Sequence, residues 1–176
     1  MKEFDLIIIG AGRASNLAVS AGKAGKRVAI IEKSTLGGTC PNRGCVPSKL
    51  LLGYAHVANA IKESNRHFID SSINSIDIKR IFEKTNSYIS KIDSIYENKF
   101  NENVQIFKGE GSFISNNIVK VNDEQLTAPK IVIATGTRPI EAPHEKAWTS
   151  DDLFPLKGKI PKSITIVGSG FIACEL

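Results

Sequence analysis

Residues 4–33 constrain the fold most strongly, because they carry the pattern of a strand, a helix and a second strand. The segment FDLIIIG is a short isoleucine-rich run that ends in glycine, which is typical of a buried parallel strand. Small and apolar residues then recur at helical spacing, and Gly25 stands where a C-cap would end the helix. RVAIIEK has the pattern of a second buried strand. Together these segments have the length of a βαβ unit, so we expect an α/β fold with a parallel sheet and flanking helices.

The turn after the first strand is rich in glycine, which favours dinucleotide binding. Gly10 permits a tight turn, and Gly12 lets the backbone approach a pyrophosphate at the start of the helix. Ser15 stands where a third glycine or an alanine is usual, and it is small enough for close packing of helix on strand. Glu32 ends the second strand about 20 residues on, where an acid can accept hydrogen bonds from ribose hydroxyls. The alternative is an ordinary strand-to-helix turn, but the strand–helix–strand context favours a dinucleotide.

Two long helices are expected in the middle of the chain. The first runs from Cys45 to about Ser64, with Pro47 in its first turn. The second covers residues 77–102, with Asp77 as its cap and with isoleucine and aromatic residues at three- and four-residue steps. This apolar stripe favours core packing; a helical arm or a coiled-coil partner is the alternative.

Further along the chain, the apolar pattern changes to that of short strands. Residues 104–127 predict a small antiparallel layer, with turns at SNN and NDEQ, and KIVIATG predicts another buried strand. The final segment, SITIVGSGFIACEL, repeats the strand–glycine–helix pattern with Gly168 and Gly170 in its turn. We therefore expect residues 1–150 to form a first nucleotide-binding domain and residues 151–176 to begin a second.

Cys40 and Cys45 are separated by four residues in GGTCPNRGC, and three chemistries use such a pair. Zinc needs four ligands, and neither the third cysteine nor the three histidines show ligand spacing around the pair, so no metal is expected. A structural disulfide is disfavoured in a cytoplasmic protein. Redox exchange fits better, because Cys45 begins a predicted helix whose dipole favours the thiolate. Lys49 lies one helical turn further on and can lean toward the same site; the alternative is a solvated surface lysine.

The composition argues against several other classes of protein. The net charge is +5, but the basic residues do not cluster, so nucleic-acid binding is not expected. The N-terminus, MKEFDLIIIG, holds only a short apolar run, which is insufficient for a signal peptide or a membrane span. Three cysteines are too few for a secreted disulfide scaffold. We therefore expect a cytoplasmic protein with no membrane partner.

The segment GGTCPNRGCVPSK resembles the active-site motif of the class I pyridine nucleotide–disulfide oxidoreductases. GAGRAS with Glu32, then the cysteine motif, then ATG at residues 134–136 and finally GSGFIACE follow one another in the family's order. The resemblance implies a Rossmann-like FAD-binding domain, FAD and NAD or NADP as cofactors, and a small-molecule or protein-bound disulfide or dithiol as substrate. A dihydrolipoamide dehydrogenase-like enzyme is ranked first, and mycothione- or mercuric-reductase-like enzymes follow.

The resemblance also implies roles for particular residues. Cys40 would attack the substrate disulfide, and Cys45 would lie against the flavin. Lys49 would lie near the flavin N5 and pair with Glu175. The residues that would bind the cofactors are Gly10, Gly12, Ser15, Glu32, Lys33, Gly38, Thr39, Cys40, Lys49, Gly111, Ala134, Thr135 and Gly136 for FAD, with Gly168 and Gly170 at the start of the NAD(P) site.

The resemblance covers only the N-terminal part of the family's chain. In the family, the chain continues through the NAD(P) domain and an interface domain that supplies an acid–base histidine, and the full-length form is expected to be a homodimer. His144 matches no such motif, so we expect this chain alone to have no turnover. The segment Pro41-Asn42-Arg43 differs from the Leu-Asn-Val and Val-Asn-Val types of the family and names no substrate. A non-catalytic FAD-binding module is the alternative, against which the intact cysteine pair argues.

Overall fold

The computed structural model describes residues 1–142, 144–156 and 158–176. The chain forms two compact units. The first unit comprises residues 1–42 and 91–138, and the second comprises residues 43–90 and 139–176. The predicted domain boundary at residue 150 stays a prediction.

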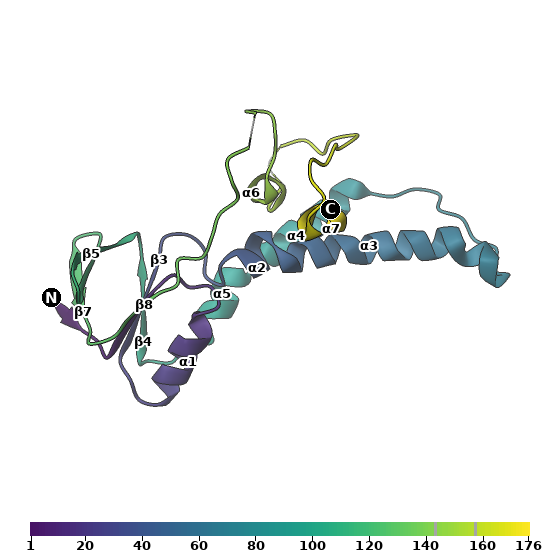
Figure 1. Ribbon diagram of the computed structural model, residues 1–176. Coiled ribbons are helices and arrows are strands. Elements are labelled where there is room, and N and C mark those ends of the chain that lie inside the picture. Colours follow the sequence, from purple (N-terminus) through teal and green to yellow (C-terminus); the bar gives the residue numbers. More distant parts are fainter. Residues whose placement is uncertain (143, 157) are drawn as a thin grey trace. The chain divides into compact units, whose positions relative to one another are not determined.

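A four-stranded parallel sheet forms the centre of the first unit. Its order is β4–β3–β2–β8, and Figure 1 shows these strands beside helix α1. Helix α1 (Ser15–Lys23) connects β2 to β3, so the expected βαβ unit is present. The predicted α/β fold with a parallel sheet is therefore confirmed. The strand bounds are Leu6–Ile9 for β2, Val28–Glu32 for β3, Val104–Lys108 for β4 and Ile131–Ile133 for β8.

Helix α1 ends at the glycine that the sequence indicated. Gly25 has a positive φ of 75°, which a residue without a side chain adopts easily. The N–H groups of Gly25 and Lys26 donate to the carbonyl oxygens of Gly22 and Ala21, each at 3.0 Å. This pair of bonds is the Schellman arrangement, and it turns the chain toward β3.

The isoleucine runs of β2 and β3 supply both faces of the parallel sheet, because successive side chains of a strand point to opposite faces. Burial of a whole isoleucine side chain contributes about 1.5–3 kcal/mol, so a strand covered on both sides is apolar throughout. On one face the buried cluster consists of Ile7, Ile9, Ala29, Ile31, Phe107, Val119, Val121, Leu126 and Ala128. On the other face, which carries α1, it consists of Leu6, Ile8, Ala11, Ala18, Val28, Ile30, Leu36 and Val104.

A second sheet, of order β1–β7–β6–β5, contains the antiparallel layer. Strands β5 (Gly111–Ser115), β6 (Ile118–Val121) and β7 (Glu124–Thr127) pair antiparallel, and β1 (Lys2–Glu3) joins β7 in parallel. The layer is therefore narrower than the predicted range of 104–127. The segment NDEQ was predicted as a turn, but only its first two residues precede β7, which begins at the third.

Strand β4 corrects the prediction, because it belongs to the parallel sheet. Val104 lies opposite Val28 and the two strands run in the same direction. A parallel pair needs a long crossover, and the helical segment between β3 and β4 supplies it. The local pattern of a short strand does not reveal which distant strand it will pair with. The sequence analysis therefore assigned β4 to the antiparallel layer.

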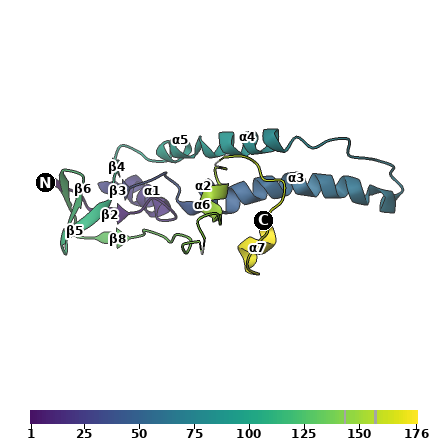
Figure 2. The same cartoon turned by 90° about the horizontal axis from the view of Figure 1, so that it is seen from above.

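Two helices that pack side by side, α3 and α4, dominate the second unit (Figure 2). Helix α3 agrees with the helix predicted from Cys45. The cap of α4 is also confirmed, because the Asp77 carboxylate accepts a hydrogen bond from the N–H of Arg80 at 2.9 Å. In the part of the chain that the structure describes, no helix combines the length and the apolar character needed to cross a membrane. The helix bounds are Cys45–Glu63 for α3, Ser64–His67 for the short 3-10 helix η1, Ile78–Ile89 for α4, Ser150–Leu153 for α6 and Phe171–Glu175 for α7.

The single helix predicted over residues 77–102 is wrong, because it is interrupted. Helix α4 ends at Ile89, and α5 (Ile92–Glu97) begins after Ser90 and Lys91. The hydroxyl of Ser90 donates to the carbonyl of Ser87 at 3.0 Å, and such local bonds compete with a regular helix. Ile89 and Ile92 are buried on either side of the interruption, but Ile78 and Ile95 are 43% and 42% exposed, so core packing describes only the middle of the stripe.

The strand predicted over residues 163–168 is also not formed. None of the strands in the described ranges includes this segment or pairs with it, and Val167 is 93% exposed. An apolar run becomes a strand only when a neighbouring strand satisfies its backbone N–H and C=O groups. The turn that follows does lead into a helix, α7, as the pattern predicted.

Candidate functional site

The glycine turn after β2 is closed against the backbone that follows β8. Gly10 has a φ of 104°, and a Cβ atom placed on it would lie 2.2 Å from the carbonyl oxygen of Ala134. The N–H of Ala134 in turn donates to the carbonyl of Ile9 at 2.8 Å. No side chain fits at position 10, so the structure accounts for the glycine that the sequence singled out. Thr135 and Gly136 continue from this contact, and Gly136 also has a positive φ, of 70°.

The same turn contacts the loop that leads to Cys40. A Cβ atom on Gly38, whose φ is 67°, would lie 2.8 Å from the Cα of Gly12. Beside this contact, the N–H of Gly37 donates to the carbonyl of Ala11 at 2.8 Å. The first unit therefore brings two predicted cofactor-binding segments, which are distant in sequence, into direct backbone contact.

The Glu32 carboxylate lies at the glycine turn, at the carboxyl end of β3. Its two oxygens accept hydrogen bonds from the N–H groups of Ala11 and Ser34, both at 2.8 Å. The hydroxyl of Ser15, which is buried, donates to the carbonyl of Ala11 at 2.8 Å. Ser15 therefore packs at the third position of the turn as expected, and it also anchors the turn. The backbone of Ala11 is held on both its N–H and its carbonyl oxygen.

Two further predicted residues lie beside Glu32. Lys33 is exposed and forms an ion pair with Glu110 at 3.0 Å. Gly111 follows that acid at the start of β5, and a Cβ atom on it would lie 3.2 Å from the Cγ2 of Ile31. Gly111 therefore lets β5 approach the end of β3 closely. The assignment of these residues to cofactor binding stays a prediction.

Buried and half-buried polar side chains that the sequence analysis missed hold the cysteine loop in place. The amide of Asn42, which is 4% exposed, donates to the carbonyl oxygens of Leu36 and Gly38, both at 2.8 Å. Asp93 accepts from the N–H of Leu36 at 2.5 Å, and Lys108 lies 3.5 Å from the same carboxylate. An asparagine between the two motif cysteines was the signal for Asn42, whereas Asp93 had none, because its partner is distant in sequence.

The two motif cysteines lie on consecutive helices. Cys40 lies in α2 (Thr39–Arg43), and Cys45 is the first residue of α3. Both side chains are exposed thiols. Ser48, in the first turn of α3, donates its hydroxyl hydrogen bond to the carbonyl of Gly44 at 2.9 Å. Among the residues that the structure describes, no cluster of histidine, cysteine and acidic side chains has the arrangement of a metal site. The pairing of the two cysteines in a disulfide stays a prediction.

Lys49 and Glu175 form an ion pair in the second unit. The Nζ of Lys49 contacts the Oε1 of Glu175, which lies in α7. The pairing that the resemblance implied is therefore present. Gly168 and Gly170 precede α7, but atoms placed as Cβ on either residue would meet no neighbour within 4 Å. The second glycine turn is thus not closed against other backbone, unlike the first.

The sequence analysis did not anticipate a second ion pair, between Arg43 and Asp151. The Nη1 of Arg43 lies 3.5 Å from the Oδ2 of Asp151, and the side chains are 32% and 34% exposed. Asp151 belongs to α6, whose N-terminus has a capping box formed by Thr149 and Asp152. This pair places a cation at the last residue of α2, two positions before Cys45.

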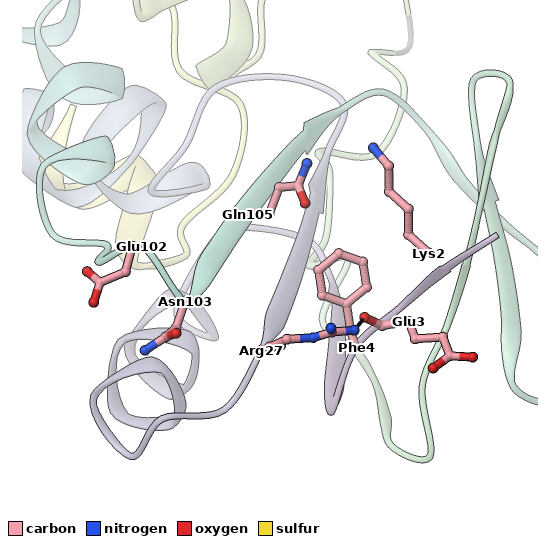
Figure 3. Close-up of a pocket in the computed structure, with 7 residues that line it drawn as sticks. All are labelled: Lys2, Glu3, Phe4, Arg27, Glu102, Asn103 and Gln105. Atoms are coloured by element: carbon pink, nitrogen blue, oxygen red, sulfur yellow. Dashed lines mark hydrogen bonds between the residues drawn. The ribbon is translucent and has the colours of Figure 1, made fainter.

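A depression of about 400 Å³ lies at the amino ends of the strands in the first unit. Figure 3 shows its lining, in which Arg27, Glu3 and Phe4 lie together near the start of β3. The glycine turn follows β2 and Glu32 ends β3, so these groups lie at the carboxyl ends of the same strands. The depression includes none of the predicted site residues. Open parallel sheets bind ligands at their carboxyl ends, which favours the glycine turn as the site.

The fold is that of an α/β protein with a glycine turn at the carboxyl ends of a parallel sheet, and comparisons with known proteins give its family. Residues 4–176 match the family described as pyridine nucleotide-disulphide oxidoreductase. The dihydrolipoyl dehydrogenase of Bacillus subtilis (strain 168) is 35% identical over 184 residues, which cover 99% of this chain and 39% of that protein. The mercuric reductase of Lysinibacillus sphaericus is 36% identical over 181 residues, which cover 98% of this chain and 33% of that protein.

A solved structure agrees with these sequence relatives. The HOCl-induced flavoprotein disulfide reductase RclA from Escherichia coli matches with a TM-score of 0.81 and 28% identity, covering 97% of this chain and 38% of that one. The chain belongs to the pyridine nucleotide-disulphide oxidoreductases, enzymes that depend on FAD and use NAD(P)H. It spans about one third to two fifths of the length of the curated relatives described above.

Proposed function

We propose that this chain is the FAD- and thiol-bearing part of an NAD(P)-linked disulfide oxidoreductase. The observation that carries the proposal is the backbone contact between Gly12 and Gly38, which joins the nucleotide turn to the loop of Cys40. A turn alone would support nucleotide binding, and a cysteine pair alone would support thiol exchange. The contact of the turn with the loop that leads to Cys40 supports a site in which both act together.

The residues of the first unit fit the ADP half of FAD. The turn at Gly10 and Gly12 carries no side chain, and it leads into the N-terminus of α1, where N–H groups and the helix dipole favour a diphosphate. Glu32 lies beside this turn, and its carboxylate is suited to ribose hydroxyls. The remainder of the FAD site would be lined by Gly38 and by the segment of Ala134, Thr135 and Gly136. When bound, FAD accepts and passes on electron pairs between a nicotinamide and the thiols.

The cysteine pair would perform the exchange with the substrate. The Cys40 thiolate attacks one sulfur of a substrate disulfide, forming a mixed disulfide and releasing the other half as a thiolate that takes up a proton. The Cys45 thiolate then attacks the Cys40 sulfur, forming the Cys40–Cys45 disulfide and releasing the second thiol. The substrate gains two electrons from the protein, and its two released thiolates take up two protons from solvent. In the opposite direction the same steps oxidise a dithiol.

Lys49 and Glu175 are proposed to position charge beside this chemistry. The lysine lies one helical turn after Cys45, and its ion pair with Glu175 holds the ammonium group in a fixed direction. The proposal assigns Lys49 to the cofactor's reactive edge and Glu175 to the orientation of Lys49.

Among members of the family, we propose a dihydrolipoamide dehydrogenase-like activity first, supported by the 35% identity to the Bacillus subtilis enzyme over nearly the whole chain. A mercuric-reductase-like activity is the second candidate, supported by an identity of 36%. We also propose a homodimer of the full-length form and a cytoplasmic location, the latter supported by the small number of cysteines.

The test uses the intact protein that carries this chain, purified with its flavin and supplied with NADH or NADPH. Oxidised lipoamide, a second small disulfide and Hg(II) are offered in turn. The proposal predicts bound FAD and reduction of a disulfide that stops when Cys45 is changed to serine. The 176-residue chain alone is expected to give no turnover. A flavin-containing protein that oxidises NAD(P)H equally well with and without Cys45, and reduces no disulfide, would instead support a flavin module without thiol chemistry.

A further inference from the structure

Arg43 places a positive charge inside the cysteine motif, between Cys40 and Cys45. It is the last residue of α2, and only Gly44 separates it from Cys45. It is also three residues after Cys40 in the same short helix, a spacing that puts two side chains on one side of a helix. The cation is therefore close in sequence to both thiols.

The charge is held in place by Asp151. The Arg43 and Asp151 side chains are 3.5 Å apart at their closest charged atoms. The segment that carries Asp151 is itself ordered, because the N–H of Asp151 donates to the hydroxyl of Thr149 at 3.2 Å and the N–H of Thr149 donates to the Asp152 carboxylate at 2.9 Å. The guanidinium therefore has a defined direction, and an acid beside it opposes its charge.

This ion pair is poorly suited to a purely structural role. Both side chains are about one-third exposed, and ion pairs with that much contact with water contribute little to stability. Exposed charges nevertheless act on approaching charged molecules over roughly 10 Å at ordinary ionic strength. A partly exposed cation beside a reactive thiol thus changes which molecules reach the thiol more than it changes how firmly the chain folds.

We propose that Arg43 makes the thiol site prefer disulfides that carry negative charge near their sulfur atoms, and that Asp151 limits this preference. The inference rests on the proposed function, because it requires that the motif thiols react with disulfides. The reaction is the exchange described above: a protein thiolate forms a mixed disulfide and the departing half of the substrate leaves as a thiol. Arg43 lowers the energy of the encounter with an anionic substrate and takes no part in breaking or forming bonds.

The test measures stoichiometric exchange of the intact, prereduced protein, without NAD(P)H, against three small symmetric disulfides that differ in charge. These are dithiodipropionate, which is anionic, bis(2-hydroxyethyl) disulfide, which is neutral, and cystamine, which is cationic. The rate constants are followed by mass spectrometry of the protein thiols. Each rate constant is divided by that of the free thiol 2-mercaptoethanol with the same disulfide, because the departing thiols differ in pKa. The wild-type protein is expected to show the highest ratio of protein rate to free-thiol rate with the anion and the lowest with the cation.

Variants of the two partners should act in opposite directions. Arg43→Gln should lower the ratio of the anion rate to the cation rate by about three- to tenfold, and Asp151→Asn should raise it by a similar factor. Arg43→Lys should restore much of the preference, because it keeps the charge. If the ion pair mattered only for the structure, both variants would change the ratio of the anion rate to the cation rate in the same direction.

Matched controls come from the exposed ion pair of Arg66 with Glu63, near the end of α3. Arg66→Gln and Glu63→Gln change the net charge by the same amounts but lie at the opposite end of α3 from Cys45. Both should leave the ratio unchanged within about twofold. Equal ratios of protein rate to free-thiol rate with all three disulfides, or anion-to-cation ratios that fall alike in the Arg43→Gln and Asp151→Asn variants, would overturn the inference. Because exchange needs no turnover, an enzyme that fails to oxidise NAD(P)H refutes the proposed function while these ratios still decide the role of Arg43.

Discussion

The chain contains two glycine turns with the same sequence pattern and different surroundings. At Gly10 a Cβ atom would strike the Ala134 carbonyl, and at Gly38 it would strike Gly12. At Gly168 and Gly170 a Cβ atom would meet nothing within 4 Å, and the segment before this turn is not paired in a sheet. The comparison teaches that the same glycine pattern is enclosed only where other backbone closes on it. The closing segments, and not the pattern, make the first turn rigid.

The largest expected contrast compares Gly10→Ala with Gly168→Ala. Both glycines have positive φ values, of 104° and 123°, so both variants strain the backbone by about 1–3 kcal/mol. Only Gly10→Ala adds a clash with backbone 2.2 Å away, which should bring its loss to more than about 3 kcal/mol. Urea unfolding of the intact protein measures both losses. Equal losses in the two variants would mean that the first turn is no more tightly enclosed than the second.

A second contrast compares Gly38→Ala with Gly170→Ala. Gly38 combines a φ of 67° with a Cβ position 2.8 Å from Gly12, so its variant should lose about 2–3 kcal/mol and should release FAD during gel filtration. Gly170 is extended and has open space around it, so its variant should change the unfolding free energy by less than about 0.5 kcal/mol. Retention of FAD by Gly38→Ala would break the link between the cysteine loop and the nucleotide turn.

The acid beside the first turn gives a smaller effect. Glu32→Gln replaces one acceptor oxygen with an amide NH2 that faces a backbone N–H, and the loss of that charged hydrogen bond should cost about 2 kcal/mol. Glu110→Gln removes an exposed carboxylate whose ion pair contributes at most about 1 kcal/mol. Thermal unfolding of both variants makes the comparison. A loss at Glu32 no greater than that at Glu110 would show that the carboxylate does not hold the turn.

The smallest contrast lies at the third position of each turn. Ser15→Ala removes the bond from the hydroxyl to the Ala11 carbonyl, which still accepts from the N–H of Gly37, so a loss of about 1 kcal/mol is expected. Ala173→Ser adds a hydroxyl to the corresponding position of the open turn and should be neutral within about 0.5 kcal/mol. Chemical denaturation resolves this difference when the two variants are measured side by side. A neutral Ser15→Ala would show that the glycine contacts alone fix the turn.

Features that depend on neighbours in sequence were predicted well. The runs that contain Ile8 and Ile30 gave the first βαβ unit, Gly25 ended the first helix, and Asp77 capped α4. In each case the partner lies within one helical turn or in the adjacent strand of the same unit. The position of Glu32 beside Ala11 follows from the same unit, because parallel strands end at one edge of the sheet.

Features that depend on distant partners could not be predicted. Strand β4 has the local pattern of an antiparallel strand, but its neighbour β3 lies across the long crossover. Residues 163–168 have the pattern of a buried strand. Whether a strand forms depends on pairing with a neighbouring strand, and the periodicity of a segment does not identify that neighbour. Asn42 and Asp93 were missed for the same reason, because each satisfies backbone groups in a loop that only the fold identifies.

The most direct test of the central claim is an anaerobic reductive titration of the intact protein. If the first turn holds FAD and the Cys40–Cys45 pair exchanges electrons with it, complete reduction needs the two electrons of the disulfide in addition to those of the flavin. The account predicts that the wild-type protein takes up twice the reducing equivalents of its bound flavin, and that Cys45→Ser takes up only the flavin's share. Identical uptake by both proteins would contradict it.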